Sequence, residues 1–117
     1  MKYILLKNQD MPTQEFDWGS LTWYASKELS NGDYTTGICR IKPGKENMVH
    51  FHPGCVETLH VRKGKIVHSI GEEFVEMNEG DTITVFEEIP HNAKNIGDCE
   101  AELLICFSTG ERKTFAI

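Results

Sequence analysis

The chain has 117 residues, a formal net charge of −6 at pH 7 with neutral histidines, and 39% hydrophobic residues, which is typical of one domain with one core. Nucleic acid is not an expected partner, because phosphate binding needs concentrated Lys and Arg and no basic cluster exceeds Arg62, Lys63 and Lys65. No apolar run approaches the roughly 20 residues of a membrane span, so no membrane association is expected.

The N-terminal third holds both tryptophans, Trp18 and Trp23. Alternation over residues 21–24 places Leu21 and Trp23 on one face, which favours an added edge strand. Large aromatic residues outside a core often mark a subunit interface, but these two could instead cap one end of their own fold. The best helix candidate, residues 23–29, is short and lacks a convincing cap.

From residue 36 onward, turn signals separate short apolar runs at intervals that suit an all-β barrel or sandwich. Pro43-Gly44, Pro53-Gly54 and Lys63-Gly64 are examples of these turns. The predicted strands are residues 36–42, 48–52, 57–61, 65–70, 74–77, 82–86, 93–96 and 101–108. Eight short strands suit a barrel made of two sheets.

A metal-ligand pattern begins at the second of these strands. Side chains alternate along a strand, so His50 and His52 point the same way. A Pro-Gly turn follows, and a chain returning antiparallel from it can bring Glu57 to the same side. His91, after the predicted strand 82–86, is the candidate fourth ligand. Imidazoles and a carboxylate form a ligand set for transition metals.

These residues carry a resemblance to a known family. The segment 44–64 matches the first signature of the cupin family, and the second signature is matched by Gly80, His91 and Asn95. The chain therefore resembles a small single-domain cupin over about residues 35–108, preceded by an extension over residues 1–34. The resemblance implies an all-β fold, a double-stranded β-helix or jelly-roll barrel, with an N-terminal extension strand.

The second signature is incomplete, because the family usually has proline and glycine where this chain has Phe86 and Glu88. That difference concerns the shape of a turn more than the ligands. The resemblance implies one divalent metal ion in the barrel, bound by His50, His52, Glu57 and His91. It also implies a homodimer, paired through the N-terminal strands. The ligand types admit Mn, Fe, Co, Ni, Cu or Zn.

The cysteines and the chain start indicate the compartment. No export signal is recognisable in the first residues, and none of the cysteines forms a Cys-x-x-Cys pair. The four cysteines are Cys39, Cys55, Cys99 and Cys106. We expect reduced thiols and a cytoplasmic protein. Cys55, which lies between two candidate ligands, either lines the metal pocket or is a small side chain in a turn.

Three further residues have open roles. His60 alternates against Glu57 and should face away from the pocket, and His68 is expected in a hairpin far from the ligands, so both are interpreted as structural or surface residues. Arg40, on the strand before the first signature, is the candidate to bind a substrate carboxylate, although a surface arginine is the alternative.

Three imidazoles and one carboxylate leave two open positions on an octahedral ion, which suits reactivity better than structural support. We favour a metal-dependent enzyme acting on a small polar metabolite such as a sugar or keto acid, by isomerisation or ring opening. An iron-dependent dioxygenase and a non-catalytic binding module for a small ligand are the alternatives, because one fold hosts many functions.

Overall fold

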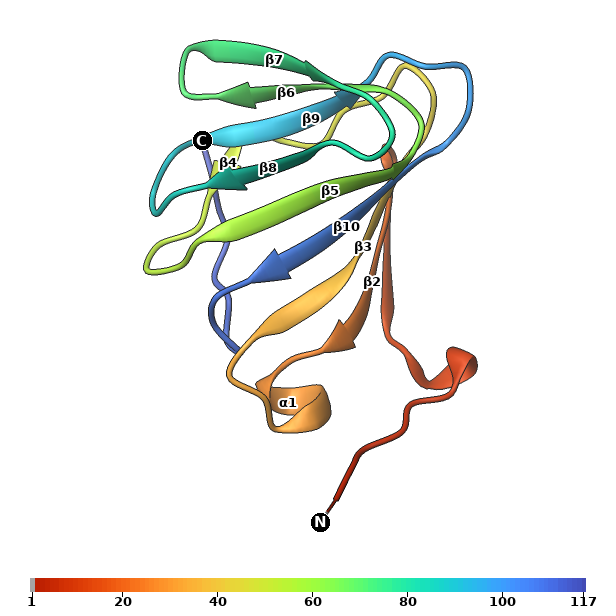
Figure 1. Cartoon of the computed structure of the whole chain (residues 1–117), viewed down its shortest axis with the longest axis vertical. Helices are drawn as coiled ribbons and strands as arrows, with labels where there is room; N and C mark the ends of the chain where they lie inside the picture. Colours follow the sequence, from red (N-terminus) through yellow and green to blue (C-terminus); the bar gives the residue numbers. More distant parts are fainter. Residues whose placement is uncertain (1) are drawn as a thin grey trace.

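The computed structural model describes residues 2–117, which form two antiparallel sheets facing each other (Figure 1). One sheet has six strands in the order β1-β2-β3-β10-β5-β8, and the other has five in the order β11-β4-β9-β6-β7. The strands are β1 (Thr13–Phe16), β2 (Gly19–Ala25), β3 (Thr35–Ile41), β4 (His50–Phe51), β5 (Glu57–Lys63), β6 (Ile66–Ile70), β7 (Glu73–Met77), β8 (Thr82–Val85), β9 (His91–Asn95), β10 (Ala101–Phe107) and β11 (Phe115–Ala116). The expected all-β jelly-roll fold is confirmed.

The core lies between the two sheets and follows the alternation of the strands. On β10, Ala101, Leu103, Ile105 and Phe107 are buried, whereas the residues between them are half-buried or exposed. The same pattern on β5 buries Glu57, so one charged side chain enters an otherwise apolar layer. Each fully buried aliphatic side chain contributes roughly 1.5–3 kcal/mol. The core also includes Cys39, Ile41, Cys55, Leu59, Val61, Ile66, Met77 and Ala93.

All eight predicted strands exist. The largest differences from the prediction are at the ends of the two strands that carry His50 and His91. Strand β4 keeps only two residues, because the Pro-Gly turn follows at once, and β9 begins at His91, two residues earlier than predicted. Strands β1 and β11 were missed, since both are short and neither contains a buried residue. None of the helices within residues 2–117 is long and apolar enough to cross a membrane.

The N-terminal region differs from the prediction. The helix candidate at residues 23–29 is helical only at its end, because Leu21 and Trp23 alternate inward and extend β2 to Ala25. The helices are the short η1 (Asn8–Asp10) and α1 (Lys27–Ser30). Strand β2 also lies between β1 and β3, so β1 is the edge strand of this sheet.

The turn between β8 and β9 shows how the chain accommodates its departure from the second signature. Glu88, at the position where a glycine was expected, has a φ of 65°. This left-handed conformation costs a residue with a Cβ atom roughly 1–2 kcal/mol. The Glu88 backbone N–H donates to the carbonyl oxygen of His52 (3.3 Å). The turn therefore keeps a conformation that favours glycine and contacts the segment that carries a candidate ligand.

We expect the substitution Glu88→Gly to raise the free energy of unfolding by about 0.5–1 kcal/mol, because the relief of strain exceeds the added entropy of the unfolded chain. Glu87→Gly is the matched control, since Glu87 is exposed and does not have a positive φ. It should lower stability by roughly 0.5–1 kcal/mol. Urea denaturation measures both, and equal effects of the two substitutions would contradict the assignment of strain to Glu88.

Candidate metal centre

Four side chains from both sheets converge at one end of the barrel. His50 lies on β4 and His91 on β9, and the two residues are directly paired in the sheet. His52 follows β4, and Glu57 is the first residue of β5 in the opposite sheet. One ligand atom from each of the four lies within 4.8 Å of the others, and all but the half-buried His50 are buried. The structure thus brings together the four residues that the sequence singles out.

Each of the three histidines is oriented by its backbone. In each ring Nδ1 lies within hydrogen-bond distance of a carbonyl oxygen. The partners are Met48 for His50 (2.6 Å), Lys113 for His52 (3.0 Å) and Ile89 for His91 (2.8 Å). A carbonyl oxygen only accepts, so each Nδ1 carries a proton and each Nε2 is left as the nitrogen that can bind a metal ion, which in His91 means displacing the proton that Nε2 shares with Glu57. Hydrogen bonds of this kind are the usual support of histidine ligands.

The atoms at the centre of the cluster lack sufficient partners. The Oε1 atom of Glu57 lies 2.8 Å from Nε2 of His91 and 3.4 Å from Nε2 of His52. The latter nitrogen is buried and has no hydrogen bond within residues 2–117. Buried polar atoms normally have a partner, because leaving one unpaired costs about 1–3 kcal/mol. A divalent cation would satisfy these atoms together, so the donor set fits such an ion.

The electrostatics of the site favour the protonation states that a metal requires. Burial alone would raise the pKa of Glu57, but the imidazoles of His52 and His91 beside the carboxylate stabilise its anion and lower the pKa to about 2. Burial, together with His91 and His52 nearby, lowers the pKa of His50 to about 4. Near neutral pH, Glu57 is therefore an anion and His50 a neutral imidazole, which are the forms that bind metals.

The cluster opens into a cavity of about 350 Å³, within the range of small-molecule sites. The hairpin β1–β2 contributes Phe16, Trp18 and Trp23 to its wall, and the C-terminal segment contributes Arg112 and Thr114. Both tryptophans pack against the core of their own chain, which agrees with the second interpretation of these residues. The homodimer stays a prediction.

The expected position of His68 is wrong, whereas that of His60 agrees with the structure. His68 is only 1% exposed, lines the cavity and stacks on His91, with 5.7 Å between ring centroids. Burial, with the charge of His91, lowers its pKa to about 4, and its Nδ1 has no hydrogen bond within residues 2–117. His60 lies beside Thr82 on the outer face of its sheet (Nδ1 to Oγ1, 2.6 Å).

The structure does not bring Arg40 to the cavity. Its Nε lies 4.0 Å from a carboxylate oxygen of Glu100, and Arg40 is absent from the cavity wall. Arg112 lines the cavity instead, and sequence reasoning missed it because it follows the last predicted strand. Cys55 is buried in the core rather than in the cavity wall, whereas Cys39 lines the cavity as a thiol whose pKa burial raises to about 12.

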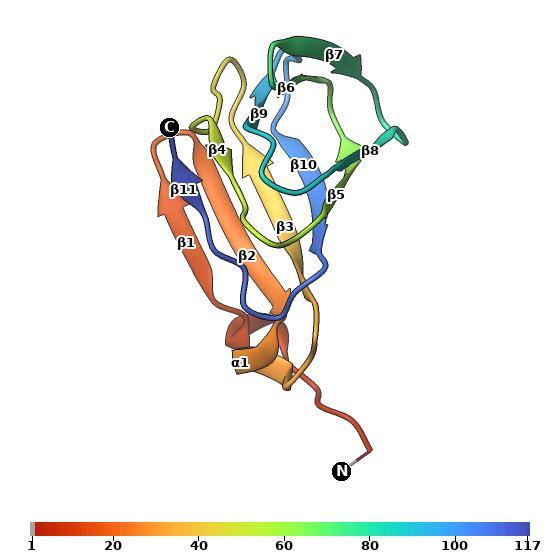
Figure 2. The ribbon, with the colours of Figure 1, turned by 90° about the vertical axis from the view of Figure 1, so that its left-hand side faces the viewer.

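The C-terminal segment supports the ligands from outside. Strand β11 pairs with β4, with Ala116 opposite His50, and the segment runs across the barrel from the end of β10 (Figure 2). In addition to the Lys113 carbonyl, Thr114 places its Oγ1 3.3 Å from Nδ1 of His52. This segment therefore fixes the orientation of His52 and the strand that carries His50.

Two known proteins are similar in sequence to part of this chain. Germin-like protein 3-8 of Oryza sativa subsp. japonica is 29% identical over 94 residues, which cover 73% of this chain and 42% of that protein. An uncharacterised protein of Methanocaldococcus jannaschii is 29% identical over 63 residues, which cover 54% of this chain and 50% of that protein. The chain thus spans half or less of the length of these relatives.

Solved structures show the same fold. The oxalate decarboxylase of Lactobacillus farciminis in complex with formate superposes with a TM-score of 0.87 at 19% identity, over 93% of this chain and 34% of that chain. The Bacillus subtilis oxalate decarboxylase, studied for its Mn(II) centres, gives 0.84 at 19% identity, over 90% of this chain and 29% of that chain. The sequence model of the cupin domain matches residues 37–107. Because that match spans more than half of the chain, the protein belongs to the cupin family.

Proposed function

We propose that the protein is a metal-dependent enzyme that acts on a small polar metabolite such as a sugar or keto acid, by isomerisation or ring opening. The observation that carries the proposal is the orientation of His50, His52 and His91, whose Nδ1 hydrogen bonds to carbonyl oxygens leave their Nε2 atoms as the metal-binding nitrogens beside Glu57. The cavity of about 350 Å³ that opens from this cluster suits a compact substrate.

One divalent transition metal ion bound by these four residues would supply Lewis-acid chemistry to substrate oxygens. Mn(II) is the first ion to test, because the structurally similar Bacillus subtilis oxalate decarboxylase has Mn(II) centres. The chain itself holds the ligands: Glu57 supplies a negative charge, and the carbonyl oxygens fix the rings. The apolar wall of Phe16, Trp18 and Trp23 excludes water from one side of the cavity.

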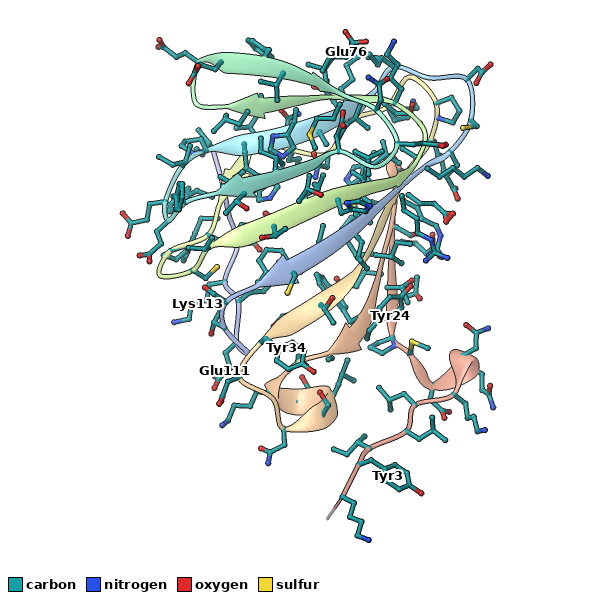
Figure 3. All side chains as sticks on the ribbon, in the orientation of Figure 1. Tyr3, Tyr24, Tyr34, Glu76, Glu111 and Lys113 are labelled. Carbon is teal, nitrogen blue, oxygen red and sulfur yellow. The ribbon has the colours of Figure 1, made fainter. Side chains whose placement is uncertain are left out.

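The assembly and the compartment are proposals of the same kind. Tyr3 and Leu5 are 78% and 66% exposed on an N-terminal segment that leads away from the barrel (Figure 3), which supports a homodimer through this region. Sedimentation velocity of the purified chain measures its mass directly. All four cysteines are free thiols, which supports a reducing compartment such as the cytoplasm.

We expect protein purified without added metal to contain close to one transition-metal ion per chain, and His52→Ala and His91→Ala to lose it. Each substitution removes a nitrogen ligand and leaves Glu57 with a weaker set of partners. His60→Ala is the matched control, since His60 lies on the outer face of the strand that carries Glu57. Elemental analysis of the four proteins tests this, and retention of metal by both ligand variants would refute the site.

Metal affinity should fall as the pH decreases below neutrality. Burial lowers the pKa of His91, but the hydrogen bond and charge of Glu57 outweigh it, so the net pKa lies above the usual 6.5. The ring therefore takes up a proton at a higher pH than an ordinary histidine, and a metal ion must displace that proton from Nε2, the nitrogen beside Glu57. His50, with a pKa of about 4, adds no such competition there.

We expect the dissociation constant for Mn(II) to increase by about tenfold for each pH unit below the pKa of His91, since one proton competes with one metal ion. Calorimetric titration between about pH 5.5 and 8 measures it, and His60→Gln should follow the same curve. An affinity independent of pH over that range would contradict the assignment.

Turnover assays separate the proposed function from its alternatives. We expect the metal-loaded protein to convert a sugar or keto acid without consuming oxygen, and Glu57→Gln to lose this activity by at least about a hundredfold, because a neutral amide is a poor ligand for such an ion. Oxygen uptake tied to turnover, measured with an oxygen electrode, would instead identify a dioxygenase. Stoichiometric binding without turnover across the substrate screen would identify a binding module.

A further inference from the structure

Arg112 is a half-buried cation at the wall of the cavity, on the segment between β10 and β11. Its guanidinium carbon lies 4.1 Å from the ring centroid of Trp23 and 5.2 Å from that of Phe107. The indole Nε1 of Trp23 donates to the side-chain oxygen of Gln14 (3.1 Å), which holds the ring in place. The position of Arg112 is therefore fixed by aromatic stacking, a contact that uses the face of the guanidinium group.

The charge of Arg112 has no carboxylate partner. No carboxylate oxygen among residues 2–117 lies within 4.0 Å of its guanidinium nitrogens. Arg40 and Lys65, by contrast, each contact a glutamate. Most other lysines and arginines of residues 2–117 are also unpaired, so what distinguishes Arg112 is its half-buried position in the cavity wall.

Most hydrogen-bond donors of Arg112 are also free. A guanidinium group has five N–H donors, and the structure uses one of them, from Nη1 to Oγ1 of Thr114. Stacking on the ring face leaves the in-plane donors available, and these match a carboxylate in bidentate geometry. Burial lowers the pKa of Arg112 and the charge of Glu57 raises it, but arginine stays charged in proteins in either case.

We infer that Arg112 forms an anion subsite of the cavity, which binds one carboxylate of a small metabolite while other oxygen atoms of that molecule reach the His/Glu cluster. The substrate class is then a dicarboxylate or a 2-oxo or 2-hydroxy acid rather than a neutral sugar. This inference rests on the proposed function only for the second contact, because the subsite itself consists of Arg112, Trp23 and Phe107.

The other cation of the C-terminal segment does not compete for this role. Lys113 is exposed, and its side chain points away from the barrel (Figure 3). Its backbone carbonyl oxygen contacts Nδ1 of His52. Lys113 therefore supports a metal ligand, whereas Arg112, its neighbour in the sequence, would bind the carboxylate at the other end of the small molecule. Arg112 is accordingly the residue to change.

The test measures the binding of oxalate, malonate and succinate, with their neutral diamides as isosteric controls, to protein with and without Mn(II). Calorimetry and tryptophan fluorescence report binding, because the guanidinium group lies on the Trp23 ring. We expect at least one dicarboxylate to bind wild-type protein about tenfold or more tightly than its diamide, and Arg112→Gln to weaken that binding at least about tenfold. Arg112→Lys should be intermediate, because it keeps the charge and loses the planar fork.

Arg40→Gln is the matched control, since it removes an arginine outside the cavity, and it should bind like wild type. Manganese content and the midpoint of thermal unfolding are measured for every variant, and Arg112→Gln should match wild type in metal content. Unchanged dicarboxylate binding in Arg112→Gln, an equal loss in Arg40→Gln, or no dicarboxylate binding to wild type would overturn the subsite. If wild-type protein binds no metal, the proposed function fails, and the comparison in metal-free protein still decides the subsite.

Discussion

The burial of the Glu57 carboxylate among three imidazoles is the constraint on which the rest of this structure depends. A charge this deep in a barrel is stable only if nearby donors or a cation replace the water it has lost. His52 and His91 supply part of that replacement, and the pKa of Glu57 falls to about 2 as a result. The same arrangement leaves Nε2 of His52 without a hydrogen bond. A bound cation would give this nitrogen a partner and would further stabilise the Glu57 carboxylate.

Holding that cluster requires both sheets and the C-terminal end of the chain. The pairing of β4 with β9 sets His50 opposite His91, while β5 brings Glu57 from the other sheet. Strand β4 is only two residues long and cannot hold its position by its own ladder. Strand β11 pairs with β4, so the C-terminal segment helps to hold the strand that carries His50 in place.

Three of the ligands were predictable from local rules, whereas His91 and the complete ligand set came from the resemblance to the cupin signatures. The alternation of a strand fixes His50 with His52, and a Pro-Gly turn returns the chain at Glu57. His68 was misplaced because its environment depends on the register between β6 and β9. That register sets His68 opposite Ala93 and Ile70 opposite His91, which places His68 on the inner face diagonally beside His91. No local pattern specifies a register across the 20 residues, 71–90, between these strands.

Arg112 escaped prediction for a related reason. It lies beyond β10 in a segment with a weak strand pattern, and only the return of that segment across the barrel brings it to Trp23. Arg40 had the more regular context, yet the alternation of β3 that buries Cys39 and Ile41 in the core directs Arg40 to the outer face. A strand places every second side chain outside the barrel, whereas a segment crossing its open end can direct a long side chain inward. Hence the cation at the cavity comes from the irregular C-terminal segment, and the same hydrogen-bonded segment holds His52.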